Sequence, residues 1–211
     1  MTTVAPITLP TNNPEDSAKR QQILAGARQV FLEHGFDAAS MNDIVRAAGV
    51  SKGTVYAYFP SKEKLFEAMV YQDRRRQAEQ SVIILDDGRP VEQVLNELGL
   101  RMVHLMSSEE SIAQVRIVIA AANKFPEIGR SFYEAGPAFA IGRIAAYFRK
   151  CMDEGKLRRA DPELAAFQFI DVISGAVHKP CMFSAQDLVA TRTPEQVVTA
   201  GVSLFMHGLA K

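Results

Sequence analysis

The sequence has few of the features that mark secreted, metal-binding or membrane proteins. Its two cysteines, Cys151 and Cys181, are too far apart for a C-x-x-C pair, and they lack the set of nearby histidines that a zinc site needs. No stretch reaches the length of a membrane span without a charge, and the N-terminus has no basic segment followed by a long apolar run. These absences predict a cytoplasmic protein in a reducing compartment with no membrane partner.

Catalytic motifs are also missing. The sequence has no ordered Ser/His/Asp set, no glycine-rich phosphate loop, no H-E-x-x-H and no paired carboxylates in a plausible setting. We therefore expect a protein that is not an enzyme and that holds no cofactor and no metal. The simplest interpretation of both cysteines is as small buried apolar residues, and thiol sensing stays open because Lys150 and Lys179 lie close to them in the chain.

Neither sign of charge is in excess, since 24 basic residues stand against 24 acidic ones. Locally, residues 17–80 hold ten Lys/Arg against seven Asp/Glu, whereas residues 81–211 hold 14 against 15. Attraction to a nucleic acid would thus depend on where charges are placed rather than on bulk charge. Apolar residues recur at helical spacing and no strand-like alternation appears, which predicts an all-α protein whose 211 residues allow two domains.

The most informative segment that is present covers residues 40–62, which predict two short helices joined by a tight turn. Ser40 can cap the first helix, and Gly49 stands where a left-handed residue would end it. Ser51 offers a second cap, and Pro60 stops the second helix. This pattern is typical of a helix-turn-helix.

The second helix has a surface unlike that of a core helix. Lys52, Thr54, Tyr56 and Tyr58 place a cation and three hydroxyls on it, with Gly53 among them. A glycine costs a helix about 1 kcal/mol against alanine, and close approach of the backbone to a base edge or a sugar-phosphate would explain it. Lysine ammonium groups and hydroxyls are common phosphate partners, and such a helix fits the major groove. The alternative is a helix-turn-helix used only for packing.

The segment SMNDIVRAAGVSKGTVYAYFPSKEKLF resembles the DNA-binding domain of the TetR/AcrR family of bacterial regulators, and the similarity extends upstream through QQILAGARQVFLEHGFDAAS to cover residues 17–65. The resemblance implies a recognition helix from Lys52 to Phe59 that binds double-stranded DNA. It assigns base-edge contacts to Lys52, Gly53, Tyr56 and Asn42, and phosphate contacts to Ser51, Thr54, Tyr58 and Lys62.

We predict three parts: a flexible N-terminal arm over residues 1–16, a three-helix helix-turn-helix DNA-binding domain over 17–62, and a helical effector-binding and dimerisation domain over 63–211. Residues 116–175 resemble the C-terminal domain of the AefR-like subgroup, which implies a cavity inside the helical bundle for a small-molecule effector. Polar, aromatic and flexible residues within apolar helices are the candidates for its lining: Met102, His104, Met106, Arg116, Tyr133, Phe139 and His178. The alternative for Arg116 is an ordinary salt bridge or an exposed face, and for the two histidines it is a structural role with satisfied hydrogen bonds. For the other four residues it is plain core packing.

The last two long helices, predicted near residues 162–178 and 194–207, are apolar on more than one face. Such helices can bury a second face against a copy of themselves in an isologous four-helix packing, as TetR-like proteins do. The residues predicted at this homodimer interface are Ala165, Ala166, Phe169, Ile173, Ala176, Val198, Gly201, Val202 and Phe205. A larger monomeric core is the alternative.

Together the motif and the resemblance predict a DNA-binding transcriptional regulator. Its expected form is a ligand-responsive repressor that binds a palindromic operator as a homodimer and leaves it when a small-molecule effector binds. The competing interpretation is a helical adaptor or interaction protein that retains an unused helix-turn-helix.

Overall fold

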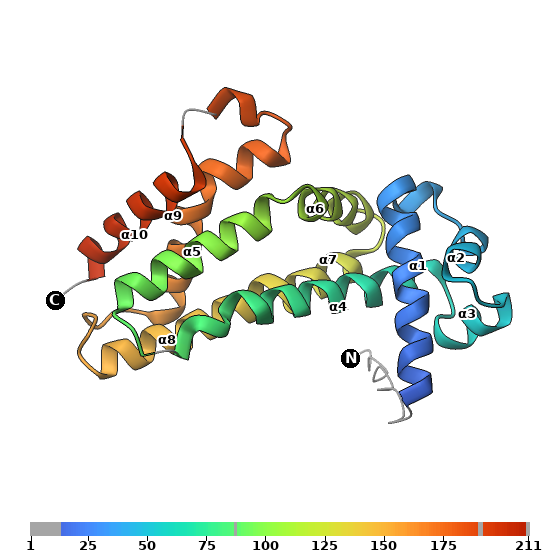
Figure 1. Cartoon of the computed structure of the whole chain (residues 1–211), viewed down its shortest axis with the longest axis horizontal. Coiled ribbons are helices and arrows are strands. Elements are labelled where there is room, and N and C mark those ends of the chain that lie inside the picture. The colour runs from blue at the N-terminus through green and yellow to red at the C-terminus, as the bar shows by residue number, and fades with distance from the viewer. Residues whose placement is uncertain (1–13, 87, 190–191, 210–211) are drawn as a thin grey trace. The chain divides into compact units, whose positions relative to one another are not determined.

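The structure, a computed structural model, describes residues 14–86, 88–189 and 192–209, and every regular element in these ranges is helical (Figure 1). The all-α prediction is therefore confirmed. The chain divides into two compact units, Met1–Met69 and Val70–Lys211. The N-terminal arm predicted over residues 1–16 lies outside the described residues except for 14–16, which begin the first helix.

The N-terminal unit contains three helices and the beginning of a fourth: α1 (Pro14–Ala38), α2 (Met41–Ala48), α3 (Lys52–Tyr58) and α4 (Lys62–Val82). Its core includes three phenylalanines in mutual contact, with ring centroids 4.7 Å apart for Phe31 and Phe66 and 5.1 Å apart for Phe36 and Phe66. These contacts hold the start of α4 in this unit, so the boundary predicted at 62/63 falls seven residues before the division at Met69.

Close approach of α1 and α2 depends on a glycine. A Cβ built on Gly26 would lie 2.5 Å from the backbone nitrogen of Ala48, a distance that no side chain allows. The amide of Gln22 donates a hydrogen bond to the carbonyl oxygen of Ala48 over 2.7 Å, and it thus also ties α1 to the end of α2. The three-helix head is assembled by these contacts around the turn.

The C-terminal unit contains the remainder of α4 and a series of helices that follow it in the chain. Their bounds are η1 (Ile83–Asp86), α5 (Val91–Ser107), α6 (Glu109–Ala122), α7 (Pro126–Tyr133), η2 (Glu134–Ala138), α8 (Phe139–Asp153), α9 (Pro162–Met182), η3 (Gln186–Val189) and α10 (Pro194–Leu209). The short segment η2 is a π-helix between α7 and α8, and it contains Pro137. No described helix in either unit is long and apolar enough to cross a membrane.

Helices α5, α8, α9 and α10 surround the main core of this unit. An aromatic cluster lies inside it, with the ring centroid of Phe205 5.3 Å from those of both Phe148 and Phe169. Helices α9 and α10 approach closely at Gly201, where a Cβ would lie 3.2 Å from Val172 and 3.3 Å from Ile173. The apolar faces of the last two helices are thus used largely by their own chain.

Helix α9 is longer than the 162–178 predicted from the sequence, since it continues through Pro180 to Met182. The prediction of its end is wrong because Pro180 lacks only its own backbone N–H. The carbonyl oxygens at the end of α9 can still accept hydrogen bonds from other groups. Arg116 of α6 donates to two of those carbonyl oxygens, that of Cys181 over 2.9 Å and that of Met182 over 3.1 Å. A cation at a helix C-terminus also opposes the negative end of the helix dipole.

Candidate nucleic-acid interface

The helix-turn-helix has the local geometry that the sequence predicts. The Ser40 hydroxyl accepts from the backbone N–H of Asp43 over 3.2 Å and caps α2. Gly49 has φ 62°, the left-handed conformation that ends this helix without a steric penalty. Ser51 then caps α3 by accepting from the backbone N–H of Thr54 over 3.1 Å. The turn is therefore encoded by side-chain caps a few residues apart.

One face of α3 packs into the head and the opposite face is open. Val55 is fully buried, whereas Lys52, Gly53 and Tyr56 are exposed. A Cβ built on Gly53 would meet no atom of the described residues closer than 3.9 Å, so no contact among them explains a glycine at this position. The ammonium of Lys52 lies 5.9 Å from the centroid of the Tyr56 ring, so the cation and the aromatic ring share this face. These are the three residues for which base-edge contact was predicted on α3.

Ser51 and Thr54, which are predicted to contact phosphate at the start of α3, retain one hydroxyl donor between them. The hydroxyls of Ser51 and Thr54 lie 2.8 Å apart and share one hydrogen bond, so one of their two hydroxyl hydrogens remains available. Asn42, in the first turn of α2, is exposed. The structure thus leaves Asn42, Ser51 and Thr54 able to contact a ligand that approaches the head.

Tyr58 departs from the prediction. Its hydroxyl donates to the carboxylate of Asp16 in α1, and this hydrogen bond, followed by burial and the nearby negative charge, raises the pKa of Tyr58. A hydroxyl has one hydrogen, and here a carboxylate takes it, so this side chain has no donor for a phosphate. A phosphate contact by Tyr58 is therefore not supported by the structure, and the residue instead joins α3 to α1.

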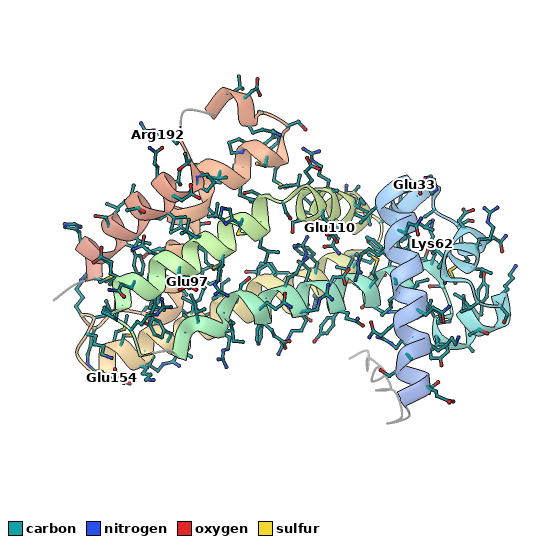
Figure 2. All side chains as sticks on the ribbon, in the orientation of Figure 1. Glu33, Lys62, Glu97, Glu110, Glu154 and Arg192 are labelled. Atoms are coloured by element: carbon teal, nitrogen blue, oxygen red, sulfur yellow. The ribbon has the colours of Figure 1, made fainter. Side chains whose placement is uncertain are left out.

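Lys62 is placed differently as well. Its ammonium, labelled at the start of α4 in Figure 2, donates to the carbonyl oxygens of Phe36 (2.7 Å), Asp37 (3.2 Å) and Ala39 (2.9 Å). It also lies 4.6 Å from the centroid of the Phe36 ring. Lysine has three donors, and all three are used to hold the end of α1. The predicted phosphate contact is thus replaced by an internal one.

Two residues near the turn were missed by the sequence-based reasoning. Gln22 locks α1 to α2, as described above, and Arg46 is exposed on α2 with its guanidinium on the carboxylate of Asp43. The pKa of Asp43 is lowered, most by the hydrogen bond from the Ser40 hydroxyl and next by the hydrogen bond from Arg46. A cation in the last turn of the first helix of the helix-turn-helix, two residues before its end at Ala48, was the available signal for Arg46.

The residues predicted to line an effector pocket differ widely in exposure, and among them Met106 and His178 are in contact. Met102 is buried in the core and Met106 is half-buried, whereas His104 and Tyr133 are exposed. Phe139 is half-buried, and the guanidinium of Arg75 lies 3.6 Å from its ring centroid. His104 and Tyr133 each lie on the outward side of their helix, so the structure does not support a place for them inside the bundle.

Arg116 and His178 have structural partners. Arg116 is exposed and holds the end of α9, where it also donates to the Ser184 hydroxyl over 2.8 Å. His178 is half-buried, and its Nδ1 lies 2.9 Å from the carbonyl oxygen of Met106. A carbonyl can only accept, so Nδ1 carries the proton and the ring joins α9 to α5. Arg116 is thus corrected from a pocket residue to a capping residue.

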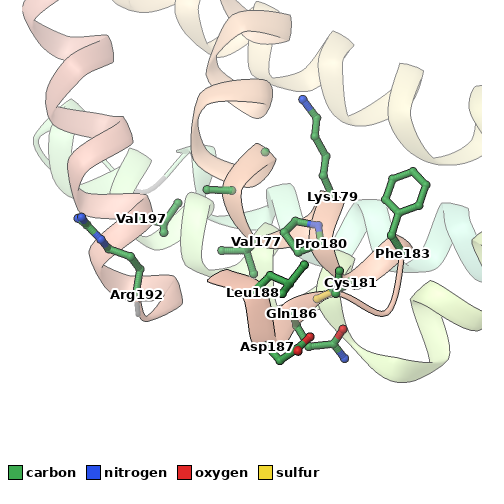
Figure 3. A pocket seen from close by; sticks show the side chains of 13 residues that line it. Val177, Lys179, Pro180, Cys181, Phe183, Gln186, Asp187, Leu188, Arg192 and Val197 are labelled. Carbon is green, nitrogen blue, oxygen red and sulfur yellow. The ribbon is translucent and has the colours of Figure 1, made fainter. Parts of the chain in front are cut away.

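An open hollow lies elsewhere, at the end of α9 (Figure 3). It has a volume of about 1010 Å³ and is lined by the end of α9, by η3 and by the start of α10. Phe183 and Leu188, which line it, are 82% and 80% exposed, so it is an open apolar groove rather than a closed cavity. None of the seven predicted pocket residues lines it.

The residues predicted at a dimer interface are mostly core residues of their own unit. Eight of the nine are buried: Ala165, Ala166, Phe169, Ile173, Val198, Gly201, Val202 and Phe205. Only Ala176 is exposed. Both helices are apolar on several faces, and these eight residues lie on the face that packs inward, so their part in a dimer stays a prediction. The large apolar residues exposed on the same helices are Leu164, Phe167, Val172 and Leu204.

Comparison with known proteins decides the family. Residues 23–69 match the bacterial regulatory proteins of the tetR family, and residues 93–208 match the C-terminal domain of AefR-like transcriptional repressors. The chain belongs to the TetR family. It is thus a DNA-binding transcriptional regulator with an AefR-like C-terminal domain, and not an enzyme.

Individual TetR-family proteins differ in how much of this chain they match. The repressor AcnR of Corynebacterium diphtheriae is 41% identical over 68 residues, which are 32% of this chain and 36% of AcnR. The chain thus matches about a third of the length of such curated relatives. Two crystal structures match throughout. A TetR-family regulator from Mesorhizobium loti has a TM-score of 0.84 at 28% identity, and the flavonoid-responsive regulator FrrA has 0.77 at 32%; each match covers 92% of this chain and 98% of the other.

Proposed function

We propose that this regulator is a repressor that binds a palindromic operator as a homodimer and leaves the DNA when a small molecule binds its C-terminal unit. The observation that carries the proposal is the outward face of α3. Lys52, Gly53 and Tyr56 are exposed there over a fully buried Val55, and no contact in the part of the chain that the structure describes accounts for the glycine. Such a helix can lie in the major groove with its N-terminal residues on base edges.

Repression and response to a ligand are supported by the relatives. AcnR is named a repressor, the matching C-terminal family is one of transcriptional repressors, and FrrA is named flavonoid-responsive. FrrA is similar to this chain over nearly its whole length, which includes the C-terminal unit. The ligand-responsive part of the proposal therefore rests on this unit rather than on the head.

Homodimer formation is supported by exposed apolar side chains on α9 and α10. Leu164 and Leu204 are 53% and 67% exposed, and Phe167 and Val172 are exposed beside them on α9. Exposed apolar side chains that gather in one patch are typical of protein–protein interfaces, and we infer that these four form such a patch. A second copy that presents the same patch would bury both, and two recognition helices about 34–36 Å apart would then read a palindrome.

The experiment that tests the function is selection of bound sequences from random duplexes, together with a gel shift on the DNA upstream of the gene itself. We expect a palindromic site whose affinity falls steeply with salt. Lys52→Ala should relax the preference at one base position in each half-site, at a cost of about 1–3 kcal/mol. Lys64→Ala is the control, because Lys64 is engaged by Glu67 on α4. Failure of the folded protein to select any sequence at low salt would leave the adaptor interpretation.

A further inference from the structure

One arginine of the C-terminal unit is buried without full use of its donors. Arg74 of α4 is 7% exposed, and it is the most buried arginine of the described residues. The aliphatic part of its side chain packs on η2, where a Cβ built on Gly136 would lie 3.4 Å from its Cβ. Its guanidinium carbon lies 4.7 Å from the centroid of Phe132 in α7. Three elements, α4, α7 and η2, thus meet around this side chain.

The hydrogen bonds of Arg74 go to neutral oxygens. Nη1 donates to the side-chain oxygen of Gln77 over 3.1 Å and lies 3.4 Å from the hydroxyl of Ser111, and Nη2 donates to the Ser111 carbonyl over 3.1 Å. Nε is buried and has no partner. Because both terminal nitrogens are directed at Ser111, the edge of the guanidinium formed by Nε and Nη2 is the side of the fork on which Nε lacks an acceptor among the described residues.

The charge of this group is only partly compensated. Burial lowers the pKa of Arg74 to about 10, and the nearby charges of Asp73 and Glu110 act in the opposite direction without offsetting burial. The group is still positive near neutral pH, so the C-terminal unit retains a buried cation with an unused donor. Buried polar groups are normally fully hydrogen-bonded, and an unmatched one therefore indicates an absent partner.

We propose that the Nε edge of Arg74 binds the carboxylate of an acidic small-molecule effector. A carboxylate has two coplanar oxygens at the spacing of the guanidinium fork, and it would supply both the missing acceptor and the missing negative charge. Phe132, which is half-buried, lies against the guanidinium, and Gly136 of η2 packs on the aliphatic part of Arg74. Apolar groups that suit the organic part of such an acid thus neighbour this side chain. The effect of such an acid on DNA binding rests on the proposed function, whereas the binding of its carboxylate to Arg74 does not.

The position of Arg74 gives the contact a route to the head. It lies five residues beyond Met69 on α4, and α4 is one continuous helix from Lys62 to Val82. A ligand bound at Arg74 between α4, α7 and η2 would change the packing of α4 within the C-terminal unit. The same helix begins in the N-terminal unit, so we expect α4 to be the element through which binding affects that unit.

Binding is tested by thermal shift on the full chain with benzoate, cinnamate and octanoate, each beside its primary amide. We expect at least one acid to raise Tm by about 5 °C at about 100 times its Kd, and its amide to have no such effect. Arg74→Met should abolish the shift. Arg75→Met is the matched control, because Arg75 is the next residue on α4, is 39% exposed and also stacks on an aromatic ring.

Three results would overturn the proposal: no acid exceeds its amide, Arg74→Met responds like the native protein, or Arg75→Met loses the response equally. If Arg74→Met does not fold, Arg74→Lys decides, because it keeps the charge and loses the fork. We expect it to weaken binding of the acid by about tenfold or more, and unchanged affinity would count against the proposal. Operator binding in the absence of any acid is measured separately, so failure of the DNA-binding function and failure of the carboxylate site give different results.

Discussion

The ammonium of Lys62 lies 2.7 Å from the carbonyl oxygen of Phe36 and 4.6 Å from the centroid of the same residue's ring. One side chain at the start of α4 thus holds both the backbone and the side chain at the end of α1. The kink at Gly35, with φ 74°, turns the chain so that the next carbonyl oxygens converge on this cation. The contact belongs to the folding of the DNA-binding unit and not to its outer surface.

Replacing Lys62 should therefore affect stability more than electrostatics. We expect Lys62→Met to lower the free energy of unfolding of the N-terminal unit by about 1–3 kcal/mol, since three carbonyl oxygens lose a charged donor. Calorimetry measures the effect, and Lys64→Met, which breaks only an ion pair on a largely exposed lysine, should change stability by less than about 1 kcal/mol. A reduced salt dependence of DNA binding with unchanged stability would instead show that Lys62 contacts phosphate.

Gly53 allows stability and DNA affinity to be separated. Because a Cβ at this position meets nothing closer than 3.9 Å, Gly53→Ala should stabilise the head by up to about 1 kcal/mol through helix propensity alone. The same methyl would stand on the face proposed to approach DNA, so operator affinity should fall while Tm does not. Gly142→Ala on α8, where a Cβ also meets nothing within 4 Å, is the control and should leave DNA affinity unchanged. Unchanged affinity of Gly53→Ala would mean that the backbone at this position does not approach DNA closely.

The proposed homodimer can be broken from its exposed side. Leu204→Glu on α10 places a charge in the patch with Phe167 and Val172, and burying an unpaired charge is strongly unfavourable. We expect size-exclusion chromatography with light scattering to give twice the chain mass of 23.2 kDa for the native protein and a single chain for the variant. Ile119→Glu on α6, at a residue 56% exposed, is the matched control and should remain dimeric. Native protein at the mass of one chain would refute the dimer.

The bond between Tyr58 and Asp16 predicts a specific response to alkaline pH. The pKa of Tyr58 is raised in the folded protein, so its contribution to stability is complete below the ordinary value of 10.0 and is lost as pH rises through the folded value. We expect the native protein to lose more unfolding free energy above about pH 10 than Tyr58→Phe does, measured by urea unfolding at a series of pH values. Asp16→Asn, which removes the carboxylate, should resemble Tyr58→Phe. Parallel profiles for all three proteins would show that the bond does not form in solution.

The amino-acid sequence by itself determined the helix-turn-helix. Ser40, Gly49 and Ser51 act on backbone groups within three or four residues of themselves, so their effect can be deduced without knowledge of the rest of the chain. The exposed face of Lys52, Gly53 and Tyr56 follows from the same local period. The all-α class and the family resemblance could be predicted from the sequence because both depend on local patterns of residues.

Only the tertiary structure decided which candidate side chains are free to contact a ligand. Lys62 and Tyr58 found partners 26 and 42 residues away, and no local pattern indicates such contacts. The faces of α9 and α10 could not be assigned either, because apolar residues surround both helices and burial depends on what α5 and α8 present to them. Arg74 could not be singled out from the sequence either, because it is one of three consecutive arginines. Only its packing against α6, α7 and η2 removes it from water and makes it differ from its two neighbours.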